Sequence, residues 1–300
     1  MTYKNEIPLV HGGHVTIGPL LACAIGDAFG AGFEYADPTF VQAHNDLSGY
    51  MQHPKWKIPP GSYTDDTQMA LGVAEHLLSG HPWTPLRLAT RWVRGFHRDQ
   101  RAGYAGHFYA LLQTTRSGAM FLRDIEPHSA KSGGAMRAFP VGFLPDASEV
   151  RDKAMFQASL THATLDGMVA AAAAALMFHH RYYRLGAQST LAPFLSGLLP
   201  GDWHTPWQGP VGAPGLEAVK AALTALQNYG SLSDILRACV AFTGDVDTVA
   251  AIAMPTAAVC DETRQDMPQV LIDGLENGLF GRDYLRLTDE KLERKFPRPA

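Results

Sequence analysis

The sequence has few cysteines, no apolar run long enough to cross a membrane and no large excess of either charge. Its three cysteines, Cys23, Cys239 and Cys260, form no CxxC pair, which argues against disulfide cross-links and zinc ribbons. The apolar stretch Met168–Phe178 is far shorter than the roughly 20 residues that span a bilayer. The first residues lack the basic, apolar and cleavage-site pattern of a signal peptide. With a formal net charge of −4, these absences predict a cytoplasmic protein with no membrane partner and no general nucleic-acid-binding surface.

Alternating strand patterns are also nearly absent, whereas helical periodicity runs along most of the chain. Apolar residues recur at i, i+3, i+4 and i+7, as in Ile17, Leu20, Leu21 and Ala24. Thr84, which a proline follows, is typical of a helix N-cap. The sequence therefore predicts an all-α fold, with helices at about 16–31, 66–77, 84–96, 103–115, 151–160, 165–180, 215–229, 232–241, 247–259 and 268–277.

Glycine and proline cluster in three connections, at 54–61, 129–145 and 200–214. None of them shows the change in composition expected of a linker, and no internal repeat is evident. A chain of 300 residues that is 46% hydrophobic can bury one large core. We therefore expect a single domain over residues 1–300, with monomer the favoured state.

Two short acidic runs carry most of the chemical information. The first acidic run is Tyr63–Thr67 and the second acidic run is Thr243–Thr248, and each contains two aspartates beside hydroxyl groups. Carboxylates and hydroxyls are hard oxygen ligands, which suit Mg²⁺ or Mn²⁺ rather than zinc. Either run alone could simply cap a helix, but two such runs far apart in sequence favour one dinuclear metal site.

A glycine-rich loop and several histidines admit two interpretations. Gly133 and Gly134 would let backbone N–H groups approach phosphate oxygens, although a Gly-Gly pair also forms ordinary turns. His162 could contact an adenosine group or serve as a helix-cap histidine. The pairs His11/His14 and His179-His180 are expected in solvated loops.

These motifs occur in a recognisable order: Gly26–Gly30 with Glu34, then Tyr63–Thr67, Ser132–Arg137, Thr161–Ala163 and Gly244–Thr248. From about residue 16 to 260 the chain resembles the ADP-ribosylglycohydrolase family, which includes the dinitrogenase-reductase-activating glycohydrolases and the ADP-ribosyl-acceptor hydrolases. The resemblance implies a compact all-α domain that holds two Mg²⁺ or Mn²⁺ ions. It further implies hydrolysis of the glycosidic bond at ribose C1″ of an ADP-ribosylated protein or small molecule.

The resemblance also assigns roles to individual residues. The metal ligands would be Thr64, Asp65, Asp66, Asp245, Asp247 and Thr248. Glu34, Asp65, Asp66 and Asp247 would be the catalytic residues, with Glu34 or an aspartate moving the proton. ADP-ribose would contact Ser132, Gly133, Gly134, Ala135, Met136, Arg137 and His162.

The acceptor group is the least defined part of the substrate. Family members that act on modified arginine place an acid after the third helix, where this chain offers Asp99 between the cations Arg98 and Arg101. Other departures from the family pattern are Val246 between the late aspartates and Lys131-Ser132 in place of a Gly-Asn pair. Arginine-linked ADP-ribose is the favoured substrate.

Several alternatives stay open. The substrate could be a free ADP-ribosyl small molecule or an ADP-ribosylated nucleic acid, or the protein could bind ADP-ribose without catalysis. A metal-dependent all-α phosphohydrolase would require adjacent His-Asp ligands, and no such dipeptide occurs.

Overall fold

The computed structural model describes residues 17–299, so the expected loop position of His11 and His14 lies outside the described residues. Within that range the chain is helical, with isolated β-bridges but no strand. The α-helices are α1 (Pro19–Gly30), α2 (Pro38–His44), α3 (Asp65–Ser79), α4 (Pro85–Arg98), α5 (Gly106–Thr114), α6 (Gly118–Asp124), α7 (Ala147–Ser159), α8 (Leu165–Tyr182), α9 (Leu191–Leu198), α10 (Gly215–Asn228), α11 (Leu232–Ala241), α12 (Val246–Ala258), α13 (Gln269–Gly274) and α14 (Arg282–Lys295). Short 3₁₀ helices are η1 (Ser132–Gly134), η2 (Phe139–Phe143) and η3 (Gln188–Thr190).

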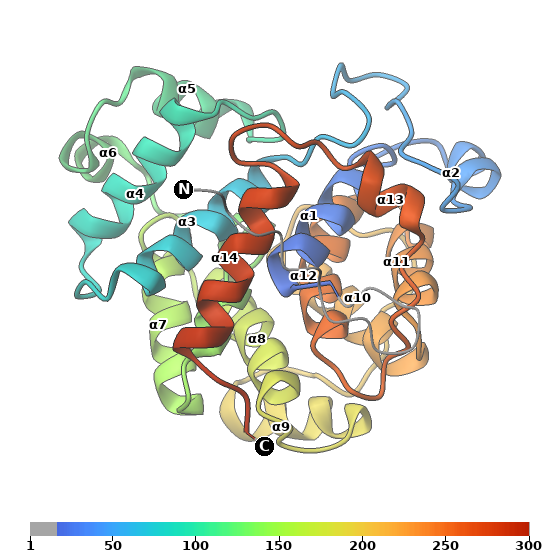
Figure 1. The fold of residues 1–300 in the computed structure, drawn as a ribbon. Coiled ribbons are helices and arrows are strands. Elements are labelled where there is room, and N and C mark those ends of the chain that lie inside the picture. Colours follow the sequence, from blue (N-terminus) through green and yellow to red (C-terminus); the bar gives the residue numbers. More distant parts are fainter. Residues whose placement is uncertain (1–16, 300) are drawn as a thin grey trace, which may run out of the picture.

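Helices α1 and α12 pack along each other in the middle of the fold (Figure 1). Helices α10 and α11 pack on α12, α8 packs on α7 and α10, and α14 covers α1 and α3. The buried apolar side chains of these helices form one continuous core. The prediction of an all-α fold is confirmed.

The pairing of α1 with α12 brings the ends of two distant motifs together. A Cβ atom at Gly30, the last residue of α1, would collide with the backbone of Asp247 in the first turn of α12. Only glycine allows the two backbones to approach this closely. The C-terminal end of α1 is therefore held directly against the second acidic run.

Most predicted helices are present, with ends that differ by a few residues. The Thr84 side chain caps α4 by accepting a hydrogen bond from the Arg87 N–H, as the sequence predicts. The sequence analysis missed α2, α6, α9 and α14. Helices α2 and α6 have seven residues each and α9 has eight, so they offer little periodicity to detect. Helix α14 buries only Leu285, Thr288, Asp289 and Leu292 among many charged residues.

The prediction that His179 and His180 lie in a solvated loop is wrong. Both lie in the last turns of α8 and are about 1% exposed. The His179 ring bonds with the Gly142 carbonyl oxygen at 3.2 Å, and the His180 ring bonds with the Thr190 hydroxyl at 3.0 Å. These partners satisfy the ring nitrogens that face them inside the core.

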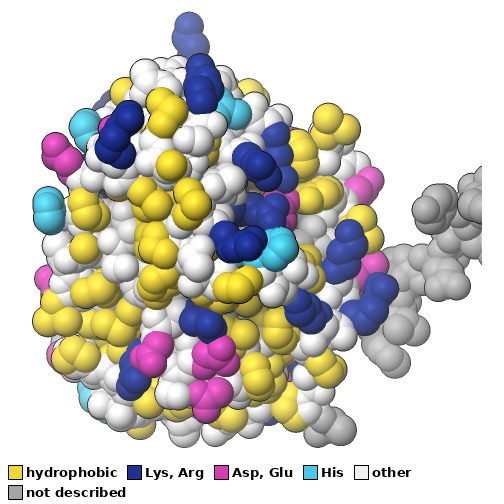
Figure 2. Space-filling view, turned by 90° about the vertical axis from the view of Figure 1, so that its left-hand side faces the viewer, with side chains coloured by type: hydrophobic (Ala, Val, Ile, Leu, Met, Phe, Trp, Pro, Cys, Tyr) yellow, Lys and Arg dark blue, Asp and Glu magenta, His cyan; other side chains and the backbone are white. Residues whose placement is uncertain are grey.

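None of the helices in residues 17–299 is both long and apolar enough to span a membrane. Figure 2 shows the face on the side of α4, α5 and α6, where basic, acidic and apolar side chains are intermingled.

Candidate active site

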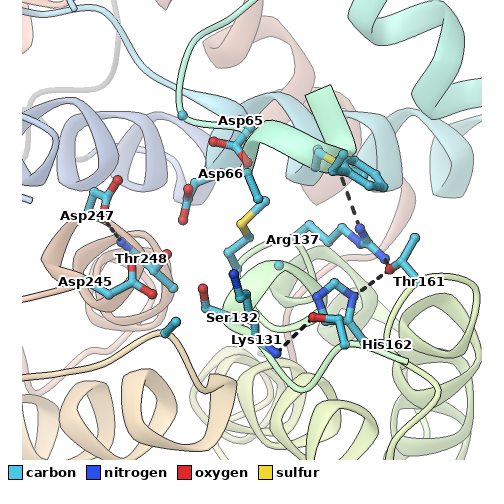
Figure 3. A pocket seen from close by; sticks show the side chains of 18 of the residues that line it. Asp65, Asp66, Lys131, Ser132, Arg137, Thr161, His162, Asp245, Asp247 and Thr248 are labelled. Carbon is cyan, nitrogen blue, oxygen red and sulfur yellow. Dashed lines mark hydrogen bonds between the residues drawn. The ribbon is translucent and has the colours of Figure 1, made fainter. Parts of the chain in front are cut away.

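A cavity of about 360 Å³ opens where both acidic runs, the Ser132 loop and the segment after α1 meet. In Figure 3 the acids lie on one side of it, whereas Arg137 and His162 lie on the other. The expected site residues that line it are Glu34, Asp65, Asp66, Ser132, Gly133, Met136, Arg137, His162, Asp245, Asp247 and Thr248. Thr64, Asp99, Gly134 and Ala135 are not among the lining residues.

The first acidic run forms the start of α3 and is anchored by a carboxylate from α1. Asp27 is fully buried, and its oxygens accept hydrogen bonds from the N–H and hydroxyl groups of both Thr64 and Thr67, at 2.6–3.1 Å. Asp27 therefore accepts the hydrogen bonds at the start of α3 that Asp65 or Asp66 could otherwise have accepted as capping residues. Asp65 and Asp66 are left free to face the cavity.

The second acidic run is anchored by its backbone. The N–H of Asp245 donates to the Val211 carbonyl at 2.9 Å, and the N–H of Val211 donates to the Thr243 carbonyl at 2.9 Å. Gly244 has a φ of +89°, and a Cβ atom there would collide with the Val211 carbonyl. Asp245 stands at the N-cap of α12 but makes no capping bond with its side chain, so it too is available to a ligand.

Glu34 joins the second acidic run. One carboxylate oxygen each from Glu34, Asp245 and Asp247 lies within 4.8 Å of the others. Burial, followed by the charges of Asp245 and Asp27, raises the pKa of Glu34 to about 8. Glu34 therefore belongs to the acid cluster.

The pKa values of the other acids at the cavity are raised as well. Burial is the largest cause that raises the pKa of Asp65, Asp66, Asp245 and Asp247, and neighbouring carboxylates add to it at Asp65, Asp66 and Asp247. Oδ1 of Asp66 is buried without a hydrogen-bond partner. Packed carboxylates with an unsatisfied oxygen are stabilised either by protons, as the raised pKa values indicate, or by bound cations. The set of carboxylates and hydroxyls fits divalent ions that prefer oxygen.

The Ser132–Arg137 loop supplies the opposite wall. The Arg137 guanidinium is buried on the ring of Trp92, 4.1 Å from its centroid, and donates to Gln157 and Thr161. Burial lowers the pKa of Arg137 to about 9, so it still carries its charge at neutral pH. Burial lowers the pKa of His162 to about 3, and Nδ1 of this neutral ring bonds with the Thr161 hydroxyl at 2.6 Å.

Several lining residues were not assigned a role from the sequence. Lys131 lies between the acids and Arg137 in Figure 3 and forms no ion pair within the described part of the chain. The sequence signal for Lys131 was its departure from the family pattern, in which this loop often has a Gly-Asn pair. Tyr35, His107 and Glu126 also line the cavity, and no sequence pattern marks them.

Asp99 lies elsewhere. Its carboxylate forms an ion pair with Arg101 at 2.6 Å, and Arg101 also pairs with Glu276. Arg98 pairs with Glu75 at 2.6 Å. Arg98 and Arg101 are thus paired with acids outside the cavity lining, and the structure does not place Asp99 in this lining.

Comparisons with known proteins agree with the family resemblance found in the sequence. The sequence matches the ADP-ribosylglycohydrolase family over residues 16–299, a longer stretch than the motifs indicated. It is 25% identical over 254 residues to the ADP-ribosylarginine hydrolase Tri1 of Pseudomonas putida (strain GB-1), covering 79% of this chain and 67% of the relative. It is 28% identical over 205 residues to the human ADP-ribosylhydrolase ARH3, covering 61% of this chain and 53% of the relative.

The fold is also found in a solved structure, described as an ADP-ribosylglycohydrolase-related protein complex. The TM-score is 0.71, the identity 23%, and the match covers 92% of this chain and 96% of that chain. At this identity the likeness shows the fold alone, and the family match carries the assignment. The chain belongs to the ADP-ribosylglycohydrolase family and is a glycosidase.

Proposed function

We propose that this enzyme removes ADP-ribose from a modified substrate by hydrolysing the bond at ribose C1″, and that it requires two Mg²⁺ or Mn²⁺ ions. The observation that carries the proposal is the buried cluster of Glu34, Asp65, Asp66, Asp245 and Asp247 around one cavity, with Oδ1 of Asp66 unsatisfied. The ions would be held by these acids together with Thr64 and Thr248. When bound, they would supply Lewis acidity and a water of lowered pKa.

The protein groups have separate tasks in this scheme. The acids on one side would hold the ions, and Lys131 and Arg137 on the other suit the negative diphosphate. Backbone N–H groups at Gly133 would approach phosphate oxygens. Departure of the acceptor through an oxocarbenium-like state requires a proton, and Glu34 or an aspartate of the cluster would move it.

Arginine-linked ADP-ribose on a protein is the favoured substrate. The Tri1 relatives from P. putida and from Serratia proteamaculans (strain 568) are both named ADP-ribosylarginine hydrolases. In this chain Glu126, exposed and unpaired within the described residues, offers a carboxylate at the cavity that a guanidinium could meet.

The test is a substrate panel of ADP-ribosylated arginine, serine, nucleic-acid ends and O-acetyl-ADP-ribose, assayed with Mg²⁺, Mn²⁺ or excess EDTA. We expect turnover with either ion, loss of turnover in EDTA and the fastest release from arginine. Asp65→Asn and Asp247→Asn should fold and lose turnover, whereas Asp166→Asn, on the exposed first turn of α8, should match the wild type. Full activity in EDTA after exhaustive dialysis would overturn the metal requirement. Binding of ADP-ribose without turnover of any substrate would indicate a non-catalytic protein.

A further inference from the structure

The peptide group between Glu34 and Tyr35 is held at both ends by distant segments. The N–H of Tyr35 donates to the Gly244 carbonyl at 2.8 Å. The carbonyl of Glu34 bonds with Nε2 of His53 at 2.7 Å. One end of this peptide is thus tied to the second acidic run and the other to the segment that follows α2.

The hydrogen bonds of His53 define which ring nitrogen carries the proton. Nδ1 accepts from the N–H groups of Lys55 at 3.0 Å and Trp56 at 2.9 Å. A nitrogen that accepts two N–H bonds is unprotonated, so Nε2 carries the proton and donates it to Glu34. The ring is 3% exposed and stacks on Trp56 with centroids 4.2 Å apart.

These hydrogen bonds hold Tyr35 in an unfavourable backbone conformation. Tyr35 has a φ of +47°, and a bulky residue in this region carries a cost of about 1–3 kcal/mol. The orientation of the peptide plane sets ψ of Glu34 and φ of Tyr35. Fixing the plane therefore fixes the direction in which the Glu34 carboxylate leaves the backbone, toward Asp245 and Asp247.

We infer that His53 is a positioning residue that keeps Glu34 in the metal-binding cluster through the Glu34 carbonyl. The inference rests on the proposed function only in taking this cluster as the ion site. It assigns the segment 53–56 a role in catalysis, although none of these residues lines the cavity.

Two substitutions separate this role from a purely structural one. His53→Asn places an amide oxygen near the position of Nδ1, so it can keep the bonds to Lys55 and Trp56 but cannot reach Glu34. His53→Gln places an amide N–H near the position of Nε2, so it can keep the bond to Glu34 and loses the other two. Mn²⁺ affinity is measured for the full chain by electron paramagnetic resonance of free Mn²⁺, and thermal stability is measured in EDTA.

We expect His53→Asn to weaken Mn²⁺ binding about tenfold, as loss of a group that orients a ligand does. His53→Gln should bind Mn²⁺ within about threefold of the wild type, even if it melts earlier. In a Glu34→Gln background, His53→Asn should cause no further loss, because its effect passes through Glu34.

Three results would overturn the inference: wild-type Mn²⁺ affinity in His53→Asn, a larger loss in His53→Gln than in His53→Asn, or additive losses with Glu34→Gln. Failure of the proposed function looks different, because the wild type itself would then bind no Mn²⁺ or release no ADP-ribose.

Discussion

The two acidic runs are alike in sequence but are anchored in different ways. The first acidic run is fixed by one side chain, since Asp27 accepts the N–H and hydroxyl groups of Thr64 and Thr67. The second acidic run is fixed by backbone bonds to Val211 and by the close approach of Gly30. The anchors leave Asp65, Asp66 and Asp245 without a capping bond, whereas Asp247 accepts the N–H of Thr248 at 2.9 Å through one oxygen.

Because the anchors differ, the two acidic runs should respond to different kinds of substitution. An anchor made by a buried carboxylate depends on charge and on acceptor geometry, whereas an anchor made by backbone contacts depends on the absence of side-chain atoms. Isosteric replacements should therefore damage the first acidic run, and the addition of a single methyl group should damage the second.

The largest effect is expected from Asp27→Asn. The substitution keeps the size of the side chain but turns one acceptor oxygen into an NH₂ group that faces N–H and hydroxyl donors. We expect a loss of about 2–4 kcal/mol in the free energy of unfolding and at least tenfold weaker Mn²⁺ binding, measured by chemical denaturation and Mn²⁺ titration.

Asp289→Asn is the matched control. Asp289 is also buried and accepts the N–H groups of Leu20 and Leu21 at the other end of α1. It should lose stability without losing Mn²⁺ affinity beyond twofold. Equal Mn²⁺ affinity in Asp27→Asn and the wild type would show that Asp27 does not set up the first acidic run.

A smaller effect is expected from Gly244→Ala in the second acidic run. The new methyl group meets both a φ of +89° and the Val211 carbonyl, so we expect a loss of about 2–3 kcal/mol. Gly209→Ala is the control, because Gly209 has a φ of +85° and no atom within 4 Å of the added Cβ. Gly209→Ala should lose only about 1–2 kcal/mol. Equal losses in urea denaturation would mean that the contact with Val211 contributes nothing.

Ionisation of Glu34 and of the aspartates in both runs should make the metal-free protein less stable as the pH rises. The folded-state pKa of Glu34 is about 8, raised from 4.5, and the pKa values of Asp65 and Asp247 are raised as well. An acid with a raised folded-state pKa contributes stability below its unfolded-state pKa, and this contribution is lost as the pH rises through the folded-state value.

In EDTA, the free energy of unfolding should therefore fall from about pH 4.5 to about pH 8, and saturating Mg²⁺ should remove most of the decline. Glu34→Gln should flatten the curve in the upper part of this range. Denaturation curves that do not change between these pH values would contradict the raised pKa values of these acids.

The sequence indicated the residues that line the cavity better than the anchors that hold them. The two acidic runs, the glycine loop and the family were recognisable because metal and phosphate chemistry restricts residue type at fixed spacing. Asp27 belongs to a motif that was noted, but its four donors become visible only when α1 lies beside α3. The bond between His53 and Glu34 joins segments 19 residues apart without any periodic pattern.

One prediction was wrong and another stays a prediction, and both depend on contacts between segments that spacing does not reveal. The pair His179-His180 was expected in solvent because histidine is polar, yet its partners Gly142 and Thr190 come from other segments. Asp99 was considered for the acceptor because it lies in a loop near the expected leaving group. The loop brings it to Arg101 instead, a contact that sequence spacing does not specify.

The smallest effect is expected from Asp99→Ala, which tests the outer support of the first acidic run. Arg101 lies over the ring of Tyr63, 3.9 Å from its centroid, and keeps Glu276 as a partner when Asp99 is removed. Since Asp99 is partly exposed, we expect a loss of about 1 kcal/mol or less. Release of ADP-ribose from arginine and from serine should fall equally, by less than threefold. A selective loss on the arginine substrate would instead place the Asp99 carboxylate against the guanidinium, and a shift of the 99–105 segment on substrate binding would then be required.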